Sequence, residues 1–237
     1  MFYFDPMYFV FLAPAILLAL WAQFKVKSAY AAASQVPSRG GYTGSDVARL
    51  VMDQAGVSGV DIEEVGGYLS DHYDPRHRVL RLSPDVFHGR SLAAAGIAAH
   101  EAGHAIQHGR GYAPLALRNG LVPLASVGGN LSMILIMIGL FIAGAGSVLG
   151  RSVLLVGIAL FSLSVLFQLV NLPVEFNASS RAREALLATG LVNVHEDQVV
   201  KKVLSAAAMT YVAATVTAVQ TLLYYLFRAG LFGGRRG

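Results

Sequence analysis

Four long apolar runs constrain this chain more strongly than any other feature of its sequence. They cover residues 6–24, 121–149, 152–172 and 206–227. Each is long enough to cross a hydrocarbon core about 30 Å thick as an α-helix. The composition agrees, because 55% of the 237 residues are hydrophobic and only 14% are charged. The sequence therefore predicts an α-helical integral membrane protein with about four transmembrane helices in a lipid bilayer.

The first apolar run has the features of an uncleaved anchor rather than of a signal peptide. No basic residue precedes it, whereas Lys25 and Lys27 follow it. Tyr8 and Trp21 lie near its two ends, where aromatic side chains favour the membrane interface. We therefore assign residues 1–27 to a first transmembrane anchor.

Residues 28–120 have the pattern of an α+β region outside the membrane. Residues 30–41 are small, polar and interrupted by Pro and Gly, which indicates a connector. Thr43 or Ser45 can cap a short helix that ends at about Gln54.

Extended segments follow that short helix. Residues 60–65 alternate between apolar and polar, as in a half-buried strand. Two more extended runs, residues 69–73 and 78–82, flank the turn-forming sequence Asp74-Pro75-Arg76-His77. The pattern predicts a small sheet.

His100, Glu101 and His104 form an H-E-x-x-H motif in an Ala-rich run, with Ser91 and Gly109 as the expected cap and end of a helix. On a helix the two histidines share one face and can bind the same zinc ion. The glutamate lies beside them, where it can act as a general base. Cysteine is absent, which excludes thiolate ligands. The motif favours a catalytic zinc site over a solvated or buried histidine stripe.

The second half of the chain is predicted to contain a membrane hairpin and a last span. Gly150-Arg151 interrupts the apolar residues 121–172 and is the expected tight turn. Pro173 is expected to begin a new helix within residues 173–205. Residues 206–237 then form the last transmembrane helix and a tail. The motif helix is not counted as a span, because its histidines and glutamate would be costly at membrane depth.

The distribution of Lys and Arg predicts the topology. Ten of these residues lie between Lys25 and Arg118 and four between Arg181 and Lys202, whereas Arg151 and three C-terminal arginines lie on the other side. The positive-inside rule then places the active site in the cytoplasm and both termini outside. The basic residues form no stripe with aromatic residues, so a nucleic-acid partner is not expected.

A catalytic zinc needs a third protein ligand and one position for water. Glu175 is favoured because the membrane hairpin returns the chain to the face of the membrane that it left. Ala178 and Ser179 are also small enough to let this segment pack closely against the motif helix. A glutamate at a helix N-terminus is also favoured by the helix dipole alone. Glu184 and His195 are the alternative third ligands.

Several separate segments carry a resemblance to a known family: residues 69–75, 79–84, 88–91, 100–107 and 173–179. In order and spacing they resemble the YugP-like neutral zinc metallopeptidases, a family of bacterial membrane proteins. The resemblance implies a zincin-like, gluzincin-type catalytic region in a multi-pass protein of the bacterial inner membrane. It also implies that His100, His104 and Glu175 bind one Zn²⁺ per chain and that Glu101 is the base.

Five residues are candidates for supporting roles. Ser179 stands where the E-x-x-A-D pattern of membrane gluzincins has Asp, and Asn177 stands where an acid is expected. Both changes affect the groups that orient a ligating histidine. Tyr73 and His72, at the predicted hairpin, could reach an oxyanion, although such turn residues are more often simply at the surface. His108, one turn beyond the motif, is expected to be structural.

These features together predict an integral membrane zinc metalloendopeptidase. A membrane-associated or misfolded polypeptide is the expected substrate, bound as an added strand at an exposed edge of the small sheet. A membrane scaffold that keeps the fold but binds a partner is the alternative, and an oligomer or a partner protein is left open. A transporter is disfavoured, because the polar residues within the spans are few and uncharged: Asn130, Gln168 and Gln220.

Overall fold

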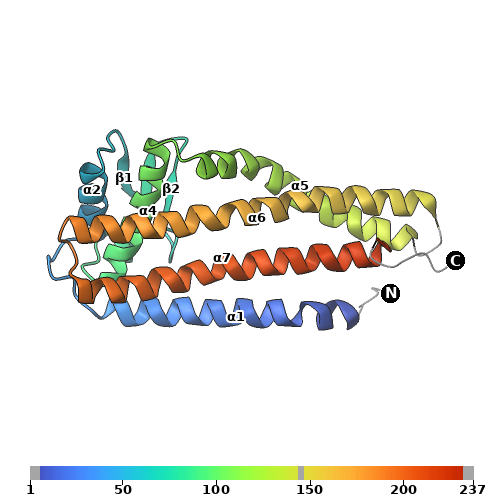
Figure 1. Cartoon of the computed structure of the whole chain (residues 1–237), viewed down its shortest axis with the longest axis horizontal. Helices are drawn as coiled ribbons and strands as arrows, with labels where there is room; N and C mark the ends of the chain where they lie inside the picture. Colours follow the sequence, from blue (N-terminus) through green and yellow to red (C-terminus); the bar gives the residue numbers. More distant parts are fainter. Residues whose placement is uncertain (1–5, 144–146, 232–237) are drawn as a thin grey trace. The chain divides into compact units, whose positions relative to one another are not determined.

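The computed structural model of the chain describes residues 6–143 and 147–231 (Figure 1). The described residues form helices and strands in the order α1 (Pro6–Ser34), α2 (Gly44–Gln54), β1 (Asp61–Glu64), β2 (His72–Asp74), β3 (Val79–Leu82), α3 (Pro84–Phe87), α4 (Leu92–Gly109), α5 (Ala113–Ala143), α6 (Val148–Ala188) and α7 (Val194–Arg228).

These elements divide into two compact units. The first, which we call the membrane unit, comprises Met1–Trp21, Leu117–Leu172 and Tyr211–Gly237. The second, which we call the site unit, comprises Ala22–Ala116 and Pro173–Thr210. The helices α1, α5, α6 and α7 contribute residues to both units.

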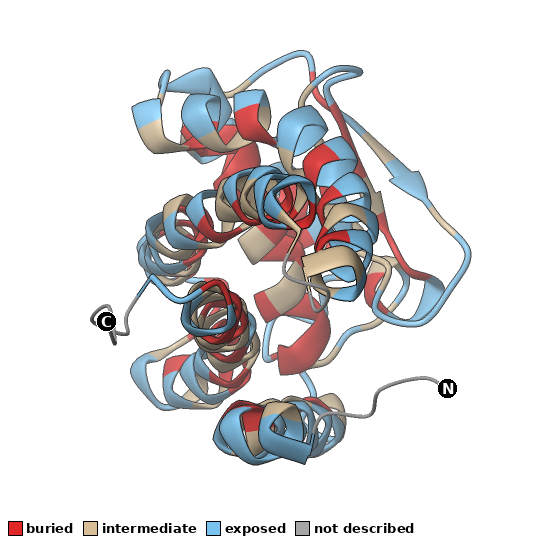
Figure 2. Cartoon of the chain, turned by 90° about the vertical axis from the view of Figure 1, so that its right-hand side faces the viewer, coloured by how far each residue is buried: buried red, intermediate tan, exposed pale blue. Residues whose placement is uncertain are grey.

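Within the described residues, four helices are long and apolar enough to cross a membrane: α1, α5, α6 and α7. Their number agrees with the four spans that the sequence predicts. Within the most apolar window of each helix, only 17% to 33% of the residues are buried by the rest of the chain. Large parts of these helices are accordingly coloured as exposed in Figure 2. Apolar surface of this extent is suited to contact with lipid.

The first helix is longer than predicted, because residues 30–34 belong to α1 rather than to a connector. The alanines of this segment have a high helix propensity. Tyr30 and Ala33 also pack with Ala93 of α4 and Val203 of α7 in a small buried cluster. Packing in the site unit thus stabilises the helix beyond its apolar run.

The break between the second and third apolar runs lies earlier than predicted. α5 ends at Ala143 and α6 begins at Val148, so Gly150 and Arg151 are inside α6; residues 144–146 lie outside the described part. A Cβ atom on Gly150 would collide with the backbone of Ile142 and Ala143. This glycine therefore permits a close approach of two helices and does not end either of them.

Pro173 lies inside a helix, although the sequence predicted a helix start there. α6 continues through it from Val148 to Ala188. The proline removes one backbone hydrogen bond of the helix. Val174 and Ala178, which follow it, are fully buried, and their packing offsets this loss.

The last helix begins before its apolar run. Asn193 caps α7, since its Oδ1 accepts hydrogen bonds from two backbone N–H groups of the first turn at 2.8 and 3.0 Å. The Arg183 guanidinium on α6 donates to the buried carboxylate of Asp197 at 2.9 and 2.5 Å. The polar residues 194–202 are therefore the first turns of α7.

The predicted sheet is present in the site unit. Its strand order is β1-β3-β2, with β1 parallel and β2 antiparallel to β3. Asp74 stabilises the turn after β2, because its Oδ1 accepts from the backbone N–H groups of Arg76 and His77 at 2.9 and 3.3 Å. β1 is shorter than the predicted segment 60–65, but the alternation holds, because Val60, Ile62 and Val65 are buried or partly buried and the acidic residues between them are exposed.

The core of the site unit lies around α4. Thr43 forms a capping box with Asp46 at the start of α2, which confirms the predicted cap. α2 packs against α4 (Figure 1). Residues of β3, α6 and α7 complete the buried cluster. Its fully buried large side chains include Leu80, Leu82, Leu92 and Leu186.

Candidate metal centre

The H-E-x-x-H motif lies in the middle of α4, where the sequence predicted a helix. Ser91 caps this helix, because its hydroxyl oxygen accepts a hydrogen bond from the backbone N–H of Ala94 at 3.2 Å. His100 and His104 are one helical turn apart, and their rings make an edge contact with centroids 4.9 Å apart. The helix therefore presents the two imidazoles together.

Glu175 of α6 joins these histidines. Potential ligand atoms of His100, His104 and Glu175 all lie within 4.8 Å of one another. The Nε2 atoms of the two histidines lie 3.3 and 3.6 Å from the same carboxylate oxygen, Oε2. Two atoms bound about 2 Å from one tetrahedral ion are expected at roughly this separation. The three side chains thus fit a single zinc ion.

A close contact between α4 and α6 brings Glu175 to the motif. Gly103 lies against the backbone of Ala178, and an added Cβ would stand 2.7 Å from the carbonyl oxygen of that residue. Ala178 itself is fully buried. Small residues on both helices therefore allow the carboxylate to reach the histidines.

The alternative third ligands, Glu184 and His195, are not part of the metal-binding group found among the described residues. Glu184 accepts a hydrogen bond from Ser180 at 2.8 Å. Asp197 pairs with Arg183, and His195 is exposed near the start of α7. Among the described residues, the group suited to a metal contains Glu175 as its only carboxylate.

Two of the predicted supporting residues lie beside the cluster. The Ser179 hydroxyl is hydrogen-bonded to Nδ1 of His100 at 3.1 Å. The Oδ1 atom of Asn177 accepts hydrogen bonds from Gln107 and Arg181 at 2.9 and 2.7 Å. Gln107, which the sequence analysis did not select, lies 3.0 Å from Nδ1 of His104. Residues three positions apart on a helix are neighbours, so the spacing of Gln107 from His104 could have indicated this contact from the sequence.

Tyr73, His72 and His108 lie outside the three-residue cluster. The Tyr73 hydroxyl of β2 is hydrogen-bonded to Nδ1 of His108 at 2.8 Å, which ties the sheet to the end of α4. His72 is exposed, and its Nδ1 lies 2.8 Å from the carbonyl oxygen of Ser70. The structural role expected of His108 is consistent with this contact.

The pKa values of the two glutamates of the site are shifted in opposite directions. Burial raises the pKa of Glu101 to about 7, and the electrostatic effect of nearby His100 only partly opposes this shift. Burial would also raise the pKa of Glu175, but the neighbouring imidazoles of His100 and His104 outweigh it and hold this pKa well below its usual range. Glu175 is therefore ionised and suited to bind a cation, whereas Glu101 is suited to exchange a proton near neutral pH.

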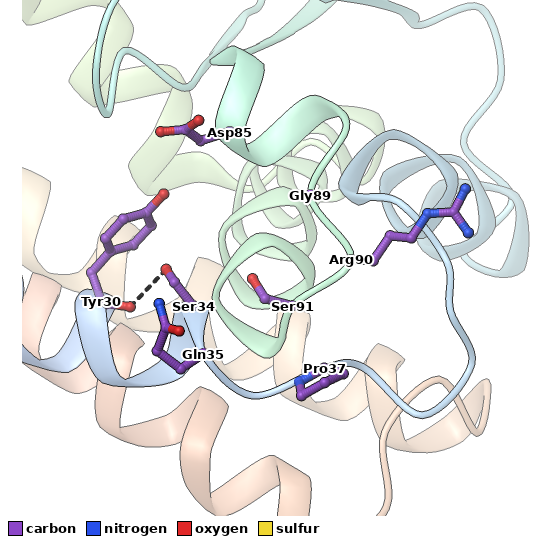
Figure 3. A pocket seen from close by; sticks show the side chains of 8 residues that line it. All are labelled: Tyr30, Ser34, Gln35, Pro37, Asp85, Gly89, Arg90 and Ser91. Atoms are coloured by element: carbon purple, nitrogen blue, oxygen red, sulfur yellow. Dashed lines mark hydrogen bonds between the residues drawn. The ribbon is translucent and has the colours of Figure 1, made fainter.

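A separate cavity of about 520 Å³ lies in the site unit between the end of α1 and the start of α4 (Figure 3). Tyr30, Ser34, Asp85 and Arg90 are among its lining residues. None of the lining residues belongs to the His–Glu cluster, so this cavity is not the candidate metal centre.

The chain matches known proteins along most of its length. The model of a family described as "Putative neutral zinc metallopeptidase" matches residues 8–230. The chain is also 44% identical over 221 residues to the "Putative membrane protease YugP" of Bacillus subtilis (strain 168), covering 93% of this chain and 96% of that relative. No solved structure matches the chain at a significant level.

Proposed function

We propose a zinc-dependent peptidase function on the premise that this chain belongs to the family of neutral zinc metallopeptidases, as the family match and the Bacillus relative show. The resemblance read from its sequence segments is thereby confirmed. The chain is a membrane member of this family, with four helices that are long and apolar enough to span a bilayer. Its family name supports a protease and a zinc cofactor.

We assign His100, His104 and Glu175 as the ligands of one zinc ion per chain. The observation that carries this assignment is the convergence of their ligand atoms within 4.8 Å, from two helices far apart in sequence. The side chains of His104 and Glu175 are buried, so the protein shields these two proposed ligands from solvent. Three protein ligands leave a position for water, as catalytic zinc sites require.

Glu101 is the proposed general base. A zinc ion bound at the site supplies a Lewis acid that polarises the scissile carbonyl and lowers the pKa of water. Glu101 takes a proton from the attacking water and passes it to the leaving amine. In the metal-free chain, burial raises the pKa of this carboxyl group to about 7, which supports a role in proton exchange near neutral pH.

The proposed substrate is a polypeptide bound as an added strand. β2 is an edge strand of the sheet and contacts α4, so it can offer main-chain hydrogen bonds beside the motif helix. A membrane-associated or misfolded polypeptide suits a site on a chain with membrane spans. We further propose that the site faces the cytoplasm in a bacterial inner membrane, on the evidence of the Lys and Arg distribution.

Metal analysis and cleavage of an unfolded model polypeptide by the purified full chain test this function. The parent should contain one zinc and cleave the polypeptide, whereas Glu175→Ala should lose both properties. Glu184→Ala is the matched control, because its carboxylate lies outside the cluster. A Glu175→Ala chain that keeps its zinc, or a loss of zinc in Glu184→Ala alone, contradicts the ligand assignment.

A further inference from the structure

Gln107 is a fully buried polar residue near the end of α4, three residues after His104. We propose that Gln107 is a positioning residue that holds His104 in the tautomer with its proton on Nδ1 and so directs the lone pair of Nε2 to the metal. This inference rests on the proposed zinc site. Its test reads metal binding rather than peptidase activity.

The hydrogen bonds of Gln107 establish which way its amide points. Its Nε2 donates to the backbone carbonyl of Val174 at 2.8 Å and to Oδ1 of Asn177 at 2.9 Å. A carbonyl oxygen can only accept, so the amide nitrogen must occupy this side. The amide oxygen, Oε1, therefore faces Nδ1 of His104 at 3.0 Å.

This orientation determines where the imidazole carries its proton. An amide oxygen is only an acceptor, so Nδ1 of His104 must be the donor. A neutral imidazole has one N–H group, and its other nitrogen, Nε2, then has a free lone pair. Nε2 is the atom that lies 3.6 Å from Oε2 of Glu175. The amide thus prepares the nitrogen that faces the proposed metal position.

A second contact keeps Asn177 in the matching orientation. Nε of Arg181 donates to Oδ1 of Asn177 at 2.7 Å, one helical turn further along α6. A guanidinium has no acceptor atom, so the oxygen of Asn177 must face both Arg181 and Gln107. The Arg181 guanidinium also lies over the Tyr112 ring, 5.8 Å from its centroid. A permanent cation therefore orients the network that ends at His104.

At Nδ1, the other histidine has no partner among the described residues that can only accept. Nδ1 of His100 contacts the hydroxyl of Ser179 at 3.1 Å. A hydroxyl can donate or accept, so it is compatible with either tautomer of His100. Loss of Gln107 should therefore weaken metal binding more than loss of the Ser179 hydroxyl does.

Zinc affinity and the visible spectrum of the Co²⁺-substituted full chain test the proposal. Gln107→Met removes the acceptor and should weaken zinc binding about 10- to 100-fold, the range found for groups that orient metal ligands. Gln107→Glu keeps an acceptor for His104 but loses the amide donors. It should bind zinc within about threefold of the parent and keep its Co²⁺ spectrum, while its melting temperature falls. Ser179→Ala should lose less affinity than Gln107→Met.

Gln198→Met is the matched control, because it makes the same substitution at an exposed position of α7. It should match the parent in both readouts. Gln107→Met with parental zinc affinity but a lower melting temperature overturns the proposal, since a purely structural role gives that result. If Gln107→Met does not fold, the zinc affinity of Gln107→Glu tests the proposal instead. A loss of zinc affinity in Gln107→Glu also overturns the proposal.

The outcomes separate this inference from the proposed function. A parent chain that binds zinc but cleaves nothing contradicts the peptidase proposal alone. The zinc affinities of the Gln107 variants then still test the role of Gln107. A parent chain that binds no zinc overturns both.

Discussion

Gly103 of α4 lies so close to Ala178 of α6 that a Cβ atom on the glycine would stand 2.7 Å from the carbonyl oxygen of Ala178. Gly103 is also one of the two residues between Glu101 and His104 in the motif. The packing of two helices and the assembly of the candidate metal centre therefore depend on the same small residue.

Gly103→Ala should weaken both the fold and the metal site. The neighbouring atom belongs to the backbone of a helix and cannot rotate away, so the helices must move apart. Overpacking of this kind lowers the free energy of unfolding by about 1–3 kcal/mol. The movement would also take Glu175 away from the histidines. Zinc titration and thermal melting measure the two effects.

Gly120→Ala is the control for that substitution. It lies in α5, and an added Cβ would meet nothing within 4 Å. Alanine has the higher helix propensity, so this variant should melt at or above the parental temperature. Equal zinc affinity in Gly103→Ala and the parent would contradict the dependence of the site on this contact.

Glu101→Gln should separate an enzyme from a scaffold. The substitution keeps the size of the side chain and removes the proposed base, while His100, His104 and Glu175 remain. The variant should fold and bind zinc as the parent does but lose peptidase activity about 10²-fold or more. His100→Ala should lose the metal as well. Parental activity in Glu101→Gln would exclude this residue as the base and leave the scaffold alternative to be considered.

The sequence predicted the features that depend on local signals. The caps at Thr43 and Ser91, the motif helix and the number of apolar spans all follow from residue types at short separations. The approach of Glu175 to the histidines was also anticipated, from the return of the membrane hairpin and the small residues Ala178 and Ser179. Its role as a ligand remains a prediction.

Features that depend on long-range packing were not predicted. Gly150 and Pro173 resemble helix breaks in the sequence, but both lie inside α6, where contacts with neighbouring helices or buried side chains determine their role. The continuation of α1 to Ser34 depends on packing against α4 and α7. Gln107 was overlooked because its partners on α6 are 67 and 70 residues away in sequence.

The predicted topology can be tested with single cysteines, because the natural chain has none. Ser58 in the site unit and Ser152 near the start of α6 are both exposed, so each can be replaced by Cys with little structural change. A membrane-impermeant maleimide should label Ser152→Cys in intact spheroplasts and Ser58→Cys only after lysis. The cysteine-free parent gives the background. The reverse pattern would place the candidate site outside the cytoplasm.

The pH dependence of stability in the metal-free chain tests the burial of Glu101. Burial raises its pKa to about 7 in the folded chain, whereas the unfolded chain keeps the ordinary, lower value. Below that ordinary value both states bind the proton, so folding carries no penalty from this group. Between the two values the unfolded state alone releases its proton, and stability falls as pH rises; above about 7 the penalty is constant.

Glu101→Gln lacks this group, so in chelator its melting temperature should exceed that of the parent at pH 8, and the difference should shrink as the pH falls toward 5. A difference that is constant from pH 5 to pH 8 would show that this carboxyl group does not have a raised pKa in the folded chain.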